Sequence, residues 1–210
     1  MKRILRYTFL FLVLVPEMNP AQTMDEFWTS LTLSTALNAR WELSLRQGLR
    51  YRDPLPTFKK TYTEGTAERT LNPAWKLSLG FRYSWYGDKT TSRSFGTLKW
   101  KQKRNHCKIQ YRCKIQSEWQ GNSSSELTIR NRGRWKGQPA KRWEPILALE
   151  TFHRVEPQSW VLSRLRCTVT GRTRLGGYIL DLEAILQWED WNENKTNRVF
   201  ITGIELARDF

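Results

Sequence analysis

The most constraining feature of the sequence is an alternation of apolar and polar residues that persists for ten or more positions in several segments. In segment 75–85 (WKLSLGFRYSW), the odd-numbered residues are aromatic or aliphatic and the even-numbered residues are small or polar. Segments 41–51, 106–119 and 178–188 follow the same rule. A period of two places successive side chains on opposite faces of a strand, so the chain predicts long β-strands with one apolar face and one polar face.

We expect about eleven strands and no helix. The expected strands are 26–36, 39–51, 58–70, 73–86, 91–103, 105–119, 122–135, 142–154, 158–170, 176–188 and 196–210. Short connections alternate along the chain with longer polar ones, as in outer-membrane barrels, whose short turns face the periplasm.

Aromatic residues stand ten positions apart at the two ends of single strands. The pairs are Trp41 with Tyr51, Trp75 with Trp85, and Tyr178 with Trp188. Ten residues of a tilted strand rise by roughly 24 Å, close to the ~25 Å apolar band of a membrane barrel. We expect these residues, with Phe210 in the last strand, to form two aromatic girdles. The alternative is a soluble β-sandwich with an aromatic core, but sandwich strands are mostly about five or six residues long.

The N-terminal residues have the organisation of a secretory signal peptide. Three basic residues precede the apolar stretch 7–15 (YTFLFLVLV), and small residues near Ala21 follow. We expect residues 1–22 to be removed, which leaves 23–210 as one barrel domain of the cell outer membrane. The removed part holds three basic residues and one acidic residue, so the net charge falls from +15 to +13.

The polar strand faces carry charged residues that would line the lumen of a barrel. The expected lumen network is Arg46, Arg50, Arg82, Arg112, Arg130, Arg132, Glu150, Arg164, Arg166, Asp181 and Glu183. Buried arginines are costly unless carboxylates face them, so we expect cross-strand ion pairs. The hairpin at 136–142 would bring Glu150 near Arg130 or Arg132.

The hairpin at 171–176 allows a sharper expectation. A turn centred in this segment would place Arg166 opposite Asp181. It would also place Arg164 opposite Glu183.

The cysteines and histidines predict no metal site and no cofactor. Cys107 and Cys113 lie six residues apart on one strand, roughly 20 Å, which no disulfide can span. They and Cys167 are expected to be small apolar fillers. His106 and His153 are too few and too scattered for a metal site.

Three classes of function remain open. The first is a non-enzymatic barrel, either structural or a narrow pore that prefers anions because arginines line it. The second is an outer-membrane hydrolase, but neither histidine has a serine at an alternate position on its own strand, so we expect no enzyme. The third is a secreted basic protein that binds polyanions such as lipopolysaccharide through 99–108 and 130–135. Export argues against nucleic acid as a partner.

Several stretches carry a family resemblance: 25–52, 75–85, 127–135, 144–154 and 201–210. Together they resemble a family of uncharacterised Gram-negative outer-membrane β-barrels, domain of unknown function 2490. The resemblance implies the fold and the location, with outer-membrane lipid as the surroundings, and it implies no activity. The aromatic Phe210 resembles the C-terminal signal by which barrel-assembly machinery recognises its clients.

The number of strands raises a difficulty. If connections alternate between the two ends, strand 26–36 runs parallel to the last strand. Because bacterial barrels have even strand numbers, either this segment lies outside a ten-stranded barrel or a twelfth strand is missing from the list. We therefore expect an all-β, antiparallel up-and-down transmembrane barrel of about 10–12 strands.

Overall fold

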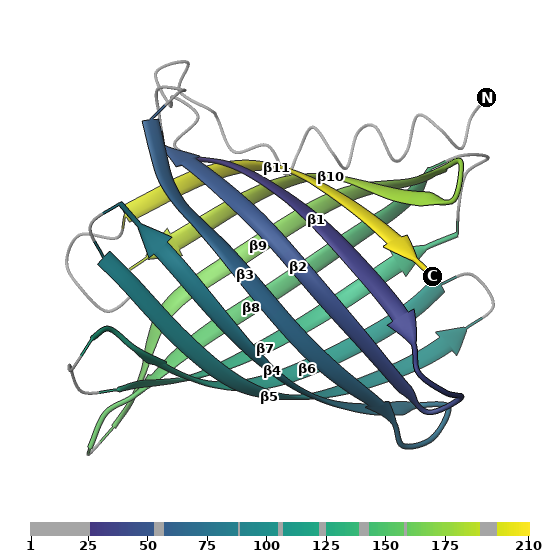
Figure 1. The fold of residues 1–210 in the computed structure, drawn as a ribbon, viewed down its shortest axis with the longest axis horizontal. Coiled ribbons are helices and arrows are strands. Elements are labelled where there is room, and N and C mark those ends of the chain that lie inside the picture. The colour runs from purple at the N-terminus through teal and green to yellow at the C-terminus, as the bar shows by residue number, and fades with distance from the viewer. Residues whose placement is uncertain are drawn as a thin grey trace.

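Eleven strands close into a barrel in which each strand pairs with its neighbours in the sequence (Figure 1). The computed structural model describes residues 26–52, 57–87, 89–104, 107–121, 125–138, 143–157, 159–189 and 197–210. The strands are β1 (Glu26–Ala36), β2 (Trp41–Arg52), β3 (Thr57–Thr70), β4 (Trp75–Tyr86), β5 (Lys89–Arg104), β6 (Cys107–Trp119), β7 (Glu126–Gly137), β8 (Glu144–Val155), β9 (Trp160–Leu175), β10 (Tyr178–Glu189) and β11 (Asn197–Asp209). The expected closed β-barrel is confirmed. The expected signal peptide lies outside the described residues.

The alternation of the sequence becomes an apolar outer face and a polar inner face. On β4, Leu79 is 63% exposed and Phe81 48% exposed, whereas Ser78 and Ser84 are each 3% exposed. The interior is therefore the polar side, which is the reverse of a soluble protein. No helix in the described part of the chain is long and apolar enough to cross a membrane.

The barrel closes through a parallel seam between its first and last strands. β1 pairs with β11 from Glu26 opposite Ile201 to Ser34 opposite Asp209, and every other strand pair is antiparallel. In Figure 1 these two strands lie side by side in purple and yellow. Eleven strands fall within the expected range of about 10–12. The even number does not occur, because β1 belongs to the closed sheet and the described residues contain no twelfth strand. An odd number of alternating strands leaves the first and last pointing the same way, and parallel pairing still satisfies their backbone groups.

The turn between β9 and β10 differs from the expected one. Gly176 and Gly177 form the connection with φ values of 54° and 88°. A two-residue hairpin of this type needs positive φ at both positions, which glycine adopts without steric cost. β9 therefore continues to Leu175, and the expected turn in the middle of 171–176 is wrong.

Two other turns at this end of the barrel have the same hydrogen-bond pattern. The side-chain oxygen of Asn38 accepts hydrogen bonds from the backbone N–H groups of Arg40 and Trp41, both at 2.9 Å. Asn72 makes the equivalent bonds to Ala74 and Trp75, also at 2.9 Å. An asparagine in this role mimics a backbone turn, so the repeated Leu-Asn pair starts β2 and β4 in the same local geometry.

Large side chains fill part of the barrel interior where glycines leave room. Tyr62 is 5% exposed and Phe95 7% exposed. Tyr62 lies across from Gly48, and a Cβ added to this glycine would come within 2.2 Å of the tyrosine ring. Phe95 covers Gly80 in the same way, also at 2.2 Å. The two glycines are thus required by the close approach of an aromatic ring from the next strand.

Candidate functional site

Cations stacked on aromatic rings occupy the lumen. The guanidinium carbon of Arg50 lies 3.7 Å from the ring centroid of Trp28, and Arg166 approaches the same ring at 5.1 Å. Arg82 lies 4.1 Å from Tyr62. Such contacts are stronger when desolvated, as in a barrel interior.

A second group of stacked cations surrounds Phe152, which is 5% exposed. Arg130 lies 4.4 Å from its ring centroid, Arg166 5.0 Å and Arg164 5.2 Å. Because Arg166 contacts both Phe152 and Trp28, it links strands β8 and β1 across the lumen.

The carboxylate of Glu150 binds three arginines. It lies 2.5 Å from Arg112, 3.0 Å from Arg130 and 3.6 Å from Arg166, and the Glu150 side chain is 3% exposed. Arg132 is directly opposite Glu150 in the β7–β8 ladder, yet the structure gives it no ion pair with a described residue. The expected neighbourhood of Glu150 with Arg130 is observed, and the additional partners come from β6 and β9.

Asp181 pairs with a residue that the sequence reasoning had not selected. Arg172 lies opposite Asp181 and donates two hydrogen bonds to its carboxylate, at 2.7 and 2.6 Å. The expected Arg166–Asp181 pair is wrong, because the Gly–Gly turn shifts the register. Arg166 lies opposite Gln187 instead and donates hydrogen bonds to its side-chain oxygen.

The second pair expected from that hairpin is wrong for the same reason. Glu183 lies opposite Thr170, which donates a hydrogen bond to it at 3.4 Å. Arg164 lies opposite Glu189 and forms an ion pair with it at 3.0 Å.

Two more of the expected lumen cations have carboxylate partners. Arg46 binds Glu205 at 2.6 Å, which joins β2 to β11 across β1. Arg82 binds its cross-strand neighbour Glu64 at 2.6 Å. Hence ion pairs and ring contacts join strands all around the inner wall.

The interior aromatic residues that the sequence reasoning missed are Trp28, Tyr62, Phe95 and Phe152. The sequence signal that could have identified them is their position in the alternation, since each shares the parity of neighbouring inward-facing residues. The charged partners Arg172 and Glu205 carry the same signal, but Arg172 had been assigned to a turn.

The expected girdle residues lie at the strand ends, on the outer face or at its edges. Trp41 and Trp75 are 40% and 37% exposed at one end, and Trp85 is 39% exposed at the other. Phe210, 67% exposed, continues the seam at the first end, because its N–H donates to the carbonyl of Ser34 at 2.9 Å. The remaining three are Tyr51, Tyr178 and Trp188, all partly exposed at strand ends.

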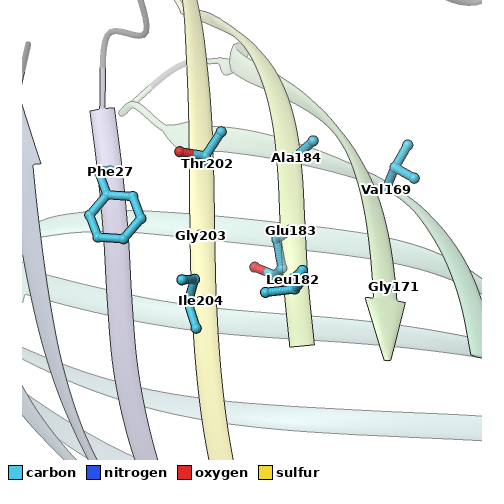
Figure 2. A pocket seen from close by; sticks show the side chains of 9 residues that line it. All are labelled: Phe27, Val169, Gly171, Leu182, Glu183, Ala184, Thr202, Gly203 and Ile204. Carbon is cyan, nitrogen blue, oxygen red and sulfur yellow. The ribbon is translucent and has the colours of Figure 1, made fainter. Parts of the chain in front are cut away.

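The outer surface carries shallow apolar hollows. One, of about 380 Å³, lies over β9, β10, β11 and β1, and Figure 2 shows its lining, including Phe27, Leu182 and Ile204. A second hollow, of about 600 Å³, includes Leu43, Leu45 and other residues of β1 to β3. Their apolar linings suit contact with hydrocarbon and offer no chemistry.

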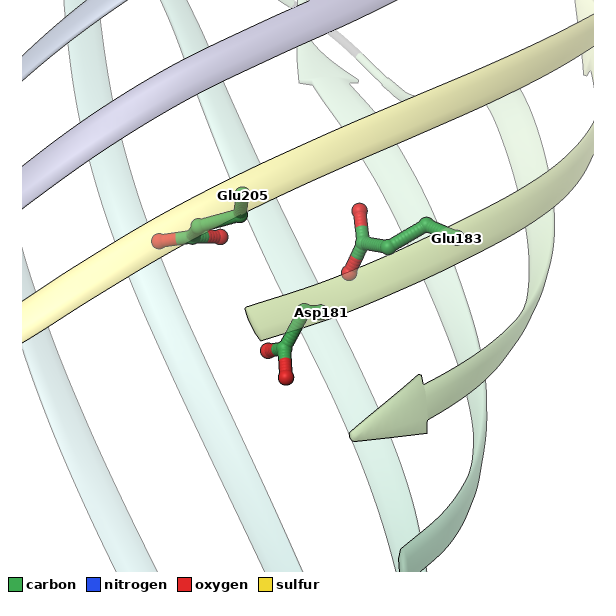
Figure 3. Close-up of side chains that lie close together, drawn as sticks. All are labelled: Asp181, Glu183 and Glu205. Carbon is green, nitrogen blue, oxygen red and sulfur yellow. The ribbon is translucent and has the colours of Figure 1, made fainter. Parts of the chain in front are cut away.

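Three carboxylates approach one another on the inner wall of β10 and β11. The ligand oxygens of Asp181, Glu183 and Glu205 all lie within 4.8 Å of one another (Figure 3). This spacing could hold a hard cation, which prefers oxygen ligands. Two of the three are already neutralised, however, by Arg172 and Arg46.

Comparison with known proteins gives a family and no activity. No curated protein matches the chain. The profile of a family described as "protein of unknown function (DUF2490)" matches residues 25–198. The chain therefore belongs to the DUF2490 family.

Proposed function

We propose that this chain is an integral outer-membrane β-barrel, exported by the signal peptide 1–22 and inserted as residues 23–210. The observation that carries the proposal is the exposed apolar outer face. Leu45, Leu79 and Leu149 are 54%, 63% and 51% exposed near the middle of their strands. A soluble protein rarely exposes such a continuous apolar surface, whereas lipid would cover it.

The aromatic residues support this placement. They lie at both ends of the strands, where amphipathic rings suit the headgroup region. On the proposed orientation the Asn38 and Asn72 turns face the periplasm. Outer-membrane lipid would surround the barrel, lipopolysaccharide is a candidate contact, and barrel-assembly machinery would recognise the strand that ends at Phe210. We propose no cofactor and no nucleic-acid partner.

The role that the interior supports best is structural. Stacked rings and ion pairs connect most strands across the lumen, so the interior charges would hold the barrel together. Hydrolysis is not proposed, because in the described part of the chain His153 makes no hydrogen bond with a serine, which a serine hydrolase needs. A narrow anion-preferring pore is the second candidate, favoured by Arg132 and Arg134, which lack ion-pair partners among the described residues.

Fractionation of cells tests the location. We expect the protein in the outer-membrane fraction, with different gel mobility before and after boiling, because a folded barrel resists detergent until heated. Recovery in the soluble periplasm without a mobility shift would contradict the proposal.

Conductance in planar bilayers separates the two candidate roles. A structural barrel should be silent, and a narrow pore should give small currents that prefer anions. Large cation-selective channels would contradict both.

A further inference from the structure

Cations oppose one another directly on the inner wall of β5, β6 and β7. Arg112 lies opposite Arg132, and Lys108 lies opposite Lys136. Directly opposed residues have Cβ atoms about 4.5–5.5 Å apart, and like charges in such positions destabilise a sheet. A wall of this kind therefore needs a source of negative charge.

The nearby carboxylates are mostly occupied. Glu150 already binds three arginines, and Asp181 binds Arg172. Glu144 binds Lys136 at 2.8 Å, and Glu205 binds Arg46. Glu183 is the one carboxylate near this wall that has no ion pair within the described residues.

Six cations of the wall have no ion pair among the described residues: Lys101, Lys103, Lys108, Lys114, Arg132 and Arg134. Of these, Lys114 lies over the ring of Phe95. The Nε atoms of Arg132 and Arg134 are also buried without a hydrogen-bond partner there. A buried donor without a partner costs free energy until a ligand or water satisfies it.

Four of these six cations, Lys101, Lys108, Arg132 and Arg134, lie close enough to act together. Lys101 and Lys108 both neighbour Gln110, the first across the β5–β6 ladder and the second along β6. Gln110 lies opposite Arg134, whose other cross-strand neighbour is the small Ala148. The charges of Lys136, Lys101 and Arg134 act on Lys108, as does the opposite charge of Glu144. The charge of Arg132 acts on Arg134. From the facing strands, Arg172, Asp181 and Glu183 also act on Arg134.

We propose that Lys101, Lys108, Arg132 and Arg134 form an anion-binding site inside the barrel, which binds a phosphate-type oxyanion of two or more negative charges. Arginine suits this ligand because its planar fork can donate two hydrogen bonds to one oxyanion. A multiply charged anion offsets the repulsion among these four cations, because the nearby carboxylates other than Glu183 are already paired. The site does not require conduction or a particular membrane.

Titration calorimetry of the barrel, folded in detergent, tests this site with inorganic pyrophosphate as the probe. We expect saturable binding of pyrophosphate at constant ionic strength. Sodium chloride at the same ionic strength should not reproduce this binding signal. Replacing both arginines (R132Q/R134Q) should weaken binding by about tenfold or more. Arg69→Gln is the matched control, because Arg69 is an exposed arginine that stacks on Trp41 on the outer face, and it should bind as the parent does.

Thermal unfolding of single variants gives an independent test, which remains possible if the double variant does not fold. Without anion, Arg134→Gln should raise the melting temperature, because it removes repulsion. Pyrophosphate should stabilise the parent and Arg69→Gln but hardly stabilise Arg134→Gln or Lys101→Gln. An anion effect that is equal in all variants, or no binding at all, would overturn the site.

A lipid headgroup could supply the same chemistry as a free anion. Phosphatidylglycerol in the micelles is therefore a second arm of the titration. Binding of pyrophosphate identifies a free anion, and binding of phosphatidylglycerol alone identifies a headgroup. Either result supports the site only if R132Q/R134Q weakens that binding by about tenfold or more, and binding of neither ligand overturns the site.

Discussion

At the scale of single residues, the inner wall depends on which carboxylate faces which arginine. Asp181 is held by Arg172 through two hydrogen bonds, and its side chain is 6% exposed. A double-mutant cycle between Asp181→Asn and Arg172→Gln should therefore show coupling of about 1–3 kcal/mol in the free energy of unfolding, because each single change leaves one buried partner uncompensated. The matched cycle uses Arg166→Gln, since Arg166 lies opposite Gln187. Its coupling to Asp181→Asn should be close to zero in a urea titration of the barrel in lipid vesicles. If Asp181 coupled more strongly to Arg166 than to Arg172, Arg166 would lie opposite Asp181, as expected from a turn centred in 171–176.

At the scale of elements, the β9–β10 hairpin shows how one turn sets the register of two long strands. Gly177 has φ of 88°, in a region that residues with a Cβ rarely adopt. Gly177→Ala should therefore cost about 1–3 kcal/mol of stability and slow folding of this hairpin. Gly133→Ala is the control, because Gly133 lies within strand β7 and an added Cβ would meet no atom within 4 Å. That change should be neutral or slightly stabilising, since alanine restricts the unfolded chain. Equal destabilisation by the two substitutions, measured by equilibrium unfolding, would show that the turn conformation does not matter.

At the scale of the whole molecule, the proposed membrane insertion depends on the apolar band of the outer face. Leu79 lies near the middle of this band and is 63% exposed. Leu79→Arg should cost about 2–4 kcal/mol in a folding titration into lipid vesicles, because the charge would lie near the bilayer midplane. Gln102→Arg, an exposed position two residues from the end of β5, should cost only about 0–1 kcal/mol. If both substitutions cost the same, the outer face does not contact lipid as proposed.

The fold class and the two faces of the wall could be predicted from the sequence, because strand alternation is a local property. Every second residue of a strand points to the same side, so Ser78 and Leu79 were assigned correctly without knowledge of any partner strand. The ends of most strands were also near the observed ones, since polar and asparagine-rich turns interrupt the alternation locally.

Contacts between strands were decided by the tertiary structure alone. The position of the β9–β10 turn changed the partner of Asp181 from Arg166 to Arg172, because a shift in register changes every pair along the ladder. The carboxylate of Glu150 binds arginines from three strands, a geometry that exists only once the barrel has closed. The parallel seam has the same origin: the unpaired backbone groups of β1 and β11 are satisfied by one another, whatever the strand number, because no other edge remains.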